Sequence, residues 1–272
     1  MKISLYDDFS IISEIYFTRF IGCLWTLVAS DGQFLISYVL QDENRQVSKV
    51  TNEKMLFEQI YPLLPNVFAE LKDIEIDQSV SVNYHYYPCG DLESFIKSGD
   101  VAALTTVQRL KIAYGIALSI KIMNDNGLYF KYLASSSVFL DENFEPHITN
   151  YAFPVSEVHK SIQDNIFELG SIFESLSADS NDFLYHLSIQ CKKSNISIEQ
   201  ILEKIISFSR TLDVSDEEIF IQYMQFAESN IAGSEHGNLE STIQAMKVGS
   251  THAKDLIEYM VDMEFIEECK KI

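Results

Sequence analysis

The stretch that decides the fold runs from residue 104 to residue 152 and reads LTTVQRLKIAYGIALSIKIMNDNGLYFKYLASSSVFLDENFEPHITNYA. Apolar residues recur at helical spacing in its first half, which predicts an amphipathic helix with one buried stripe over 106–124. The pair Asn126-Gly127 ends that helix. Two short β-prone runs, 137–140 and 147–149, flank a polar turn and predict a hairpin. The expected order is helix, loop, hairpin, loop.

This order resembles the large lobe of eukaryotic protein kinases, where a long helix leads into His-Arg-Asp-Leu-Lys-x-x-Asn, a hairpin and Asp-Phe-Gly. Both motifs align without a gap, but the residues differ. Tyr132 takes the position of the catalytic aspartate, Ala134 that of the loop lysine, and Ser137 that of the metal-binding asparagine. Asn150 begins the run that stands at Asp-Phe-Gly. No carboxylate remains in either motif.

Phosphoryl transfer depends on positioning and on metal-assisted charge stabilisation, and Mg²⁺ prefers anionic oxygen ligands. Loss of a general base costs about 10²–10⁴ in rate, and loss of one preorganised electrostatic group costs about 10²–10³. The resemblance therefore implies a kinase-like fold without normal kinase turnover, which is a pseudokinase.

The N-terminal part resembles the small lobe of a kinase. Strand-forming runs are expected at 9–15, 21–28 and 34–40, a helix over 51–61, and strands near 73–77 and 79–85. The segment that aligns with the glycine-rich phosphate loop contains only Gly22, and bulky side chains would fill the space over a triphosphate. Ser37 takes the position of the strand lysine that holds the phosphates in kinases.

The run 86–96, YYPCGDLESFI, resembles the kinase hinge and the short helix after it. The resemblance implies that the backbone near Tyr86 and Tyr87 would face adenine, and that Tyr84 would be the gatekeeper at the back of that pocket. Hinge contacts need no particular side chain, so weak ATP binding without metal stays open. Tyr84 combined with Phe17 and Phe20 could exclude adenine, and the alternative is that these three aromatic residues are ordinary core.

The run 164–174, DNIFELGSIFE, resembles the central buried helix of the large lobe, with Asp164 and Gly170 retained. In the family this aspartate is buried and hydrogen-bonds the backbone of the catalytic loop, so Asp164 is expected to do so. A helix cap is the alternative role, and both could hold together. Too few residues precede this helix for a peptide-substrate platform.

The resemblance covers about 9–208, nearest to the tyrosine-kinase-like kinases, and predicts an α+β, two-lobed domain over 1–209. The small, β-rich N-lobe would occupy about 1–86 and the helical C-lobe about 87–209, with late helices at 183–191 and 198–208. An acidic helical tail, 210–272, would follow. Its candidate helices are 216–230, 238–247 and 251–263. Residues 245–257 resemble one Sel1-type helical hairpin, a repeat that follows some kinase domains; a generic helical tail is the alternative.

The composition limits the classes of partner and cofactor that are expected. A net charge of −20 argues against nucleic acid and anionic membranes, both of which call for basic patches. The four cysteines are scattered and the histidines show no metal-ligand spacing, so neither a disulfide framework nor a metal site is expected. No apolar run approaches the ~20 residues of a membrane span, and no signal-peptide pattern is seen. A cytoplasmic protein without a metal cofactor is expected.

Three functions are consistent with these residues. The first is a non-enzymatic pseudokinase that acts as a binding, scaffold or allosteric module in signalling, with a protein partner such as an active kinase. The second is a sensor that binds ATP without metal and without turnover. The third is a residual or atypical ATP-dependent protein kinase using Tyr132, Lys131, Ser137 or Asn150.

Overall fold

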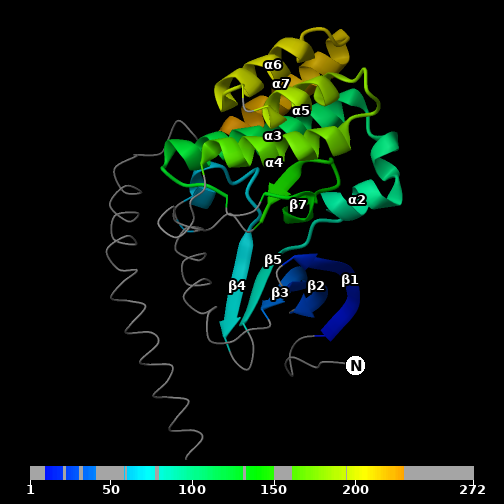
Figure 1. The fold of residues 1–272 in the computed structure, drawn as a ribbon. Helices are drawn as coiled ribbons and strands as arrows, with labels where there is room; N and C mark the ends of the chain where they lie inside the picture. Colours follow the sequence, from blue (N-terminus) through cyan, green and yellow to red (C-terminus); the bar gives the residue numbers. More distant parts are fainter. Residues whose placement is uncertain are drawn as a thin grey trace, which may run out of the picture.

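The computed structural model describes residues 10–20, 23–30, 33–40, 58, 60–76, 80–130, 133–149, 161–193 and 195–229. In these residues the chain is α+β, as expected. A sheet of longer strands forms one end of the molecule and a group of helices forms the other (Figure 1).

The larger sheet has five antiparallel strands in the order β1-β2-β3-β5-β4. Their bounds are β1 Ser10–Phe20, β2 Cys23–Ser30, β3 Gln33–Leu40, β4 Leu71–Ile76 and β5 Val80–His85. β1 runs past its expected end at residue 15, with three register shifts against β2 before residue 20. The segment that aligns with the phosphate loop is therefore largely strand. The helix expected over 51–61 lies outside the described residues, except for Glu58 and Ile60, which are helical.

A smaller sheet of three strands has the order β6-β7-β8 and contains the predicted hairpin. Its strands are β6 Gly90–Asp91, β7 Val138–Leu140 and β8 Pro146–Ile148. Between β6 and β7 the chain forms helix α2, Leu92–Ser98, and the 3₁₀ turn η3, Asp100–Ala103. The buried Asp91 begins α2 by accepting hydrogen bonds from the N–H and the hydroxyl of Ser94. A single bridge between Phe68 and Ile148 joins the segment before β4 to this hairpin.

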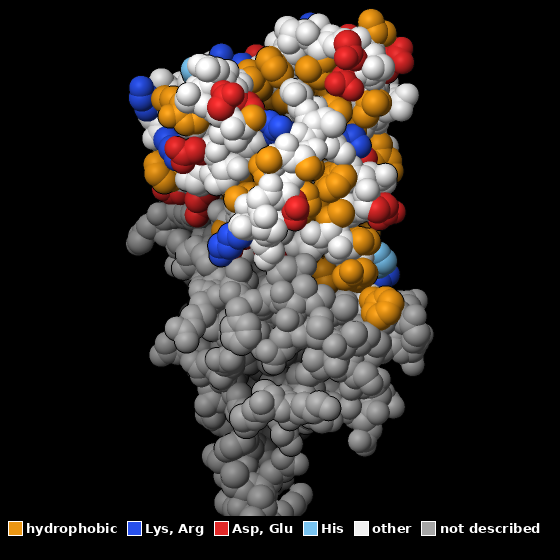
Figure 2. Space-filling model, turned by 90° about the vertical axis from the view of Figure 1, so that its right-hand side faces the viewer, with side chains coloured by type: hydrophobic (Ala, Val, Ile, Leu, Met, Phe, Trp, Pro, Cys, Tyr) orange, Lys and Arg blue, Asp and Glu red, His pale blue; other side chains and the backbone are white. Residues whose placement is uncertain are grey.

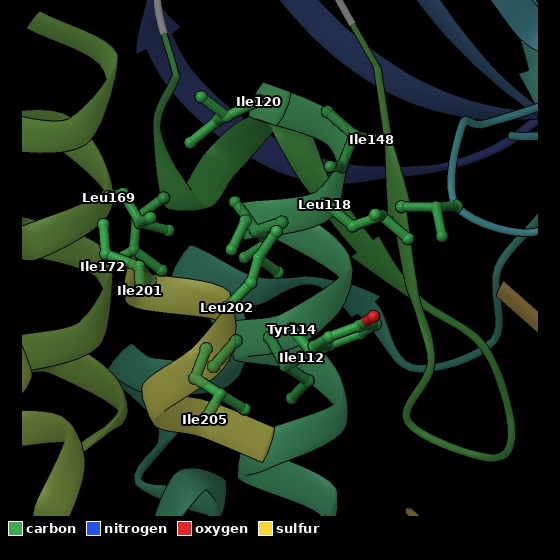
Figure 3. Packing of buried hydrophobic residues seen from close by; sticks show 14 of the residues in the cluster. Ile112, Tyr114, Leu118, Ile120, Ile148, Leu169, Ile172, Ile201, Leu202 and Ile205 are labelled. Carbon is green, nitrogen blue, oxygen red and sulfur yellow. The ribbon is translucent and has the colours of Figure 1, made fainter. Parts of the chain in front are cut away.

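Helix α3, Thr106–Asp125, is the predicted central helix and begins with a capping box formed by Thr105 and Gln108. The expected single stripe is wrong, because α3 is buried on every side along residues 110–120. Isoleucines and leucines fill the faces between the predicted positions. Figure 3 shows α3 side chains packed against Ile201 and Ile205 of one neighbouring helix, while Tyr114 points to the opposite side.

In the described part of the chain four further helices follow α3. They are α4 Ile162–Leu176, α5 Phe183–Lys192, α6 Ile198–Ser209 and α7 Val214–Glu228. Of these, α4, α6 and α7 pack on α3, and α5 packs on α4. The helices predicted at 183–191, 198–208 and 216–230 correspond to α5, α6 and α7. The tail helices predicted at 238–247 and 251–263, with the Sel1-like hairpin, lie outside the described residues.

Helix α7 comes from the predicted tail but packs into the same core as α3. It buries Phe220, Tyr223 and Ala227 against α3, and the Tyr114 hydroxyl donates a hydrogen bond to Glu228. Gly115 makes this approach possible, because a Cβ there would meet the Tyr223 hydroxyl and would lie 2.6 Å from Cγ of Pro146. The division at 209/210 stays a prediction, but α7 and α3 share one hydrophobic core.

The core is divided into two clusters. The larger one lies among the helices, and the smaller one lies between the two sheets. The smaller cluster, called here the junction cluster, consists of Ile36, Ala69, Val82, Tyr84, Tyr87 and Phe139. It connects β3 and β5 of the larger sheet to β7 of the hairpin.

Candidate functional site

The loop that aligns with the catalytic loop enters β7 through the 3₁₀ turn η4, Ser135–Ser137. Ser137 is buried, and its hydroxyl donates to the Ala134 carbonyl at 2.8 Å. The same hydroxyl accepts from the Ala134 N–H at 3.3 Å, and the Ser137 carbonyl accepts two hydrogen bonds from Thr149. The polar groups of Ser137 are thus used inside the turn and hairpin. Tyr132, Lys131 and Asn150 lie outside the described residues.

The first turns of α4 hold this loop on both sides of residues 131 and 132. Asn165 is 1 % exposed, and its side chain makes two hydrogen bonds with the backbone of Phe130. Its Oδ1 accepts from the Phe130 N–H at 3.0 Å, and its Nδ2 donates to the Phe130 carbonyl at 2.9 Å. Nδ2 also donates to Glu168 at 2.9 Å, and Glu168 accepts from the Leu133 N–H at 3.3 Å. The loop ends are therefore fixed to α4 by one amide and one carboxylate.

The expected buried role of Asp164 is wrong. Asp164 is exposed, and its carboxylate accepts hydrogen bonds from the N–H and hydroxyl of Ser161, so it caps α4. The buried contact with Phe130 belongs to the next residue, Asn165. Spacing could have found it, because the family motif Asp-x-Tyr-Ser-Phe-Gly places its aspartate five residues before its glycine, and Gly170 counts back to Asn165. The neutral amide donates to a carbonyl, which an ionised aspartate cannot do.

Gly170 has a packing role. A Cβ at this position would lie 2.8 Å from the Cβ of Cys191 and 3.0 Å from the carbonyl oxygen of Ser188. The close contact of α4 with α5 therefore requires glycine here. Burial raises the pKa of the Cys191 thiol to about 12, so the thiol is neutral at physiological pH.

Ser37, expected at the position of the phosphate-binding lysine, is buried in β3. It lies opposite Asn83 of β5 in the register of the sheet. Asn83 is also buried, and its Nδ2 atom has no hydrogen-bond partner. This position therefore carries a neutral polar pair of adjacent strands instead of a cation.

The three tyrosines of the predicted hinge, Tyr84, Tyr86 and Tyr87, differ in their environments. Tyr84 is buried in the junction cluster, as the core alternative expects for this residue, while the side chains of Phe17 and Phe20 lie outside the described part. Tyr87 is also buried in the cluster, whereas Tyr86 is half-buried with its ring 5.9 Å from that of Phe34. The Tyr87 hydroxyl accepts a hydrogen bond from the Glu70 N–H at 3.0 Å, and its ring stacks on His147 at 4.2 Å. Burial raises the pKa of Tyr87 well above its usual range. Tyr84 and Tyr87 thus hold the two sheets together.

Charged residues of the hairpin next to this junction, Asp141 and Glu145, were not predicted as functional from the sequence. Burial alone would raise the pKa of Asp141, but hydrogen bonds from His147 and from the Glu145 and Asn143 N–H groups bring the net pKa below its usual value. Lys111 of α3 reaches Glu145 at 2.7 Å. No local sequence pattern predicts the Lys111–Glu145 pair, because the two residues are 34 positions apart in the sequence.

Chemically, the described residues provide a loop whose two ends are hydrogen-bonded to α4. Among the described residues, no three His, Cys, Asp or Glu side chains gather where they could hold a metal ion. On the face in Figure 2, apolar side chains reach the surface of the helical part in small groups among charged ones.

The comparisons with known proteins give no family. A scan against protein-family models finds no match, and a search of the curated proteins finds no matching relative. In the part of the chain that the structure describes, no helix has the length and apolar character to cross a membrane.

Proposed function

We propose that this chain is a non-catalytic protein of the kinase fold, a pseudokinase, that acts as a binding, scaffold or allosteric module for a signalling protein. Its partner would be a protein such as an active kinase, and its place of action the cytoplasm. The net charge of −20 disfavours nucleic acid and acidic membrane surfaces as partners.

The observation that carries the proposal is a loop that is held in place but lacks the groups for phosphoryl transfer. Asn165 and Glu168 fix the loop through Phe130 and Leu133, and the Ser137 hydroxyl is bonded within its own turn. From residue 130 to residue 140 the sequence contains no carboxylate. A fold that holds this loop in place without a general base or metal ligands in it supports a binding role for the protein.

The packing of the junction cluster also supports a non-catalytic role. Tyr84, Tyr87 and Phe139 belong to one buried apolar cluster, and the neutral Ser37 stands where kinases carry the phosphate-binding lysine. A tetra-anionic nucleotide would meet a strongly acidic protein without this cation. Mg²⁺-dependent ATP binding is therefore expected to be absent or very weak.

The test combines two measurements on the full chain. Thermal unfolding with millimolar ATP, with and without Mg²⁺, should show no metal-dependent stabilisation. Mass detection of transferred phosphate should stay at background. A metal-dependent stabilisation of about 2.7 kcal/mol, expected at ~100 times the dissociation constant, would refute the proposal. So would phosphate transfer that Tyr132→Phe or Asn150→Ala abolishes.

A metal-independent ATP sensor is the second candidate. It is favoured by the half-buried position of Tyr86 beside Phe34, because adenine contacts at a hinge use backbone groups. Equal stabilisation by ATP with and without Mg²⁺, together with background phosphate transfer, would favour this function. A residual ATP-dependent kinase is the third candidate, and metal-dependent transfer would favour it.

A further inference from the structure

Helix α7 carries most of the large apolar side chains that are exposed in the described part of the chain. Four of the six belong to this helix, and they are Val214, Ile219, Ile221 and Phe226. Single exposed apolar residues are ordinary on protein surfaces, whereas a group of them marks an interaction site. The helix therefore has apolar surface beyond what its packing on α3 uses.

Two of these residues enclose a pair of carboxylates. Val214 is 73 % exposed and Ile221 is 36 % exposed. Glu217 and Glu218 come three and four residues after Val214, and four and three residues before Ile221. At this spacing all four side chains lie on one side of the helix. We call these four residues the acidic α7 face.

The two carboxylates of this face are not used within the described structure. Among the described residues neither Glu217 nor Glu218 forms an ion pair, whereas Asp213 is used as the N-cap of the helix. From residue 211 to residue 246 the sequence contains no lysine or arginine. The helix dipole favours acidic residues in a first turn, but it accounts neither for Glu218, which follows that turn, nor for the exposure of Val214.

We propose that the acidic α7 face binds a basic amphipathic helix of a partner protein. The inference rests on the proposed binding role of the chain and names the chemistry of its partner. A surface that covers Val214 and Ile221 also covers the two carboxylates between them. A carboxylate that is taken out of water without a cation destabilises the complex. The partner therefore needs Lys or Arg side chains beside apolar ones, and a helix with both on one side supplies them.

Charge disfavours a second copy of this chain as the occupant. The protein has a net charge of −20, so two copies repel one another. Pairing of two acidic α7 faces would also bring four carboxylates together, and like charges at an interface weaken it. A basic partner is attracted by the same field, which speeds association and makes it dependent on salt.

Fluorescence anisotropy of the full chain with a labelled peptide tests this inference. The probe is a synthetic helix of leucine and lysine, about 14 residues long, with leucine at i, i+3, i+4 and i+7. It should bind with a dissociation constant below about 100 μM at ~0.15 M salt. The same peptide with glutamate in place of lysine should not bind.

Variants of the face should weaken binding of the lysine peptide. Val214→Ser/Ile221→Ser should raise the dissociation constant by about tenfold or more, because it removes the apolar contact. Glu217→Gln/Glu218→Gln should raise it by about fivefold or more, because it removes the two charges. The glutamine variant changes charge and keeps side-chain size, so it tests the inference even if the serine variant loses its fold.

Two matched controls separate this face from the general acidity of the protein. Ile219→Ser/Phe226→Ser makes the same apolar change on another side of α7, where the residues between the pair are neutral. Glu58→Gln/Glu142→Gln removes the same charge from two exposed positions elsewhere. Each control should change the dissociation constant by less than about twofold. Circular dichroism checks that each variant keeps its helix content.

Three results would overturn the inference. They are no binding of the lysine peptide, binding that the face variants leave unchanged, and equal losses in the face variants and the controls. The assay contains no nucleotide, so its failure is distinct from failure of the proposed function. With phosphate transfer at background, loss of the acidic α7 face as a site would leave the binding role in place, whereas phosphate transfer would refute that role whatever the peptide does.

Discussion

Replacing Asn165 by aspartate should destabilise the protein, although aspartate is the residue at this point of the kinase motif that the run 164–174 resembles. The Asn165 amide donates to the Phe130 carbonyl and to Glu168, and both donors are lost in Asn165→Asp. A buried acceptor left unsatisfied costs about 1–3 kcal/mol. The introduced carboxylate would also lie beside the Glu168 carboxylate, which adds to the cost. We expect a loss of about 2–4 kcal/mol in the free energy of unfolding at pH 7.

The loss should depend on pH in a defined direction. Burial and Glu168 would raise the pKa of the introduced carboxyl group in the folded state, because both disfavour its charged form. Its protonated form is neutral and can donate a hydrogen bond again. The variant should therefore recover stability relative to the unsubstituted chain as pH falls toward the unfolded pKa of about 3.9, and lose it as pH rises through the raised folded pKa.

Urea unfolding followed by circular dichroism at several pH values measures both effects. Asp164→Asn is the matched control, because it changes the neighbouring exposed cap and should cost about 1 kcal/mol or less. Asn165→Leu should be destabilising at every pH, because it removes both partners of Phe130. If Asn165→Asp were as stable as the unsubstituted chain at pH 7, the assignment of the Nδ2 donor would be refuted.

Three further predictions follow from packing and charge. Gly170→Ala should cost about 1–3 kcal/mol, measured by urea unfolding, because its Cβ would lie 2.8 Å from the Cys191 Cβ; an unchanged midpoint would contradict the close α4–α5 contact. Asp141 has a lowered folded pKa, so its contribution to stability is present above its unfolded pKa and lost as pH falls through the folded pKa. Asp141→Asn should flatten the acid limb of the stability profile, and an unaltered limb would count against the role given to its hydrogen bonds. Lys111→Met leaves the Glu145 carboxylate without its cation and should lower the free energy of unfolding by about 3–5 kcal/mol. The double variant Lys111→Met/Glu145→Gln should recover much of this loss in thermal unfolding. Equal losses in the single and the double variant would show that the two residues are not coupled.

Local patterns predicted the central helix and the hairpin, because spacing and turn residues within one segment determine them. They gave one stripe for α3, since apolar periodicity does not reveal that neighbours cover the other faces. Asp164 and Asn165 could not be ranked from residue type alone, because both cap helices and both form hydrogen bonds. Counting five residues back from Gly170 selects Asn165, and in the structure this is the residue that bonds Phe130.

The Lys111–Glu145 pair depends on a contact between distant segments, which no single-segment pattern contains. The positions aligned with the catalytic aspartate and the metal loop, Tyr132 and Asn150, lie outside the described residues and stay predictions. The pseudokinase function is likewise a proposal that these contacts support.

The contact at Gly115 has a consequence for how the protein opens. Because Tyr223 of α7 and Pro146 of the hairpin both close over this glycine, neither can separate from α3 without exposing apolar surface that the other helps to cover. Helix α7, the hairpin and the central helix would therefore form one cooperative unit in native-state exchange. A shortened chain ending at residue 209 would lack part of this unit, so an expression boundary belongs after α7.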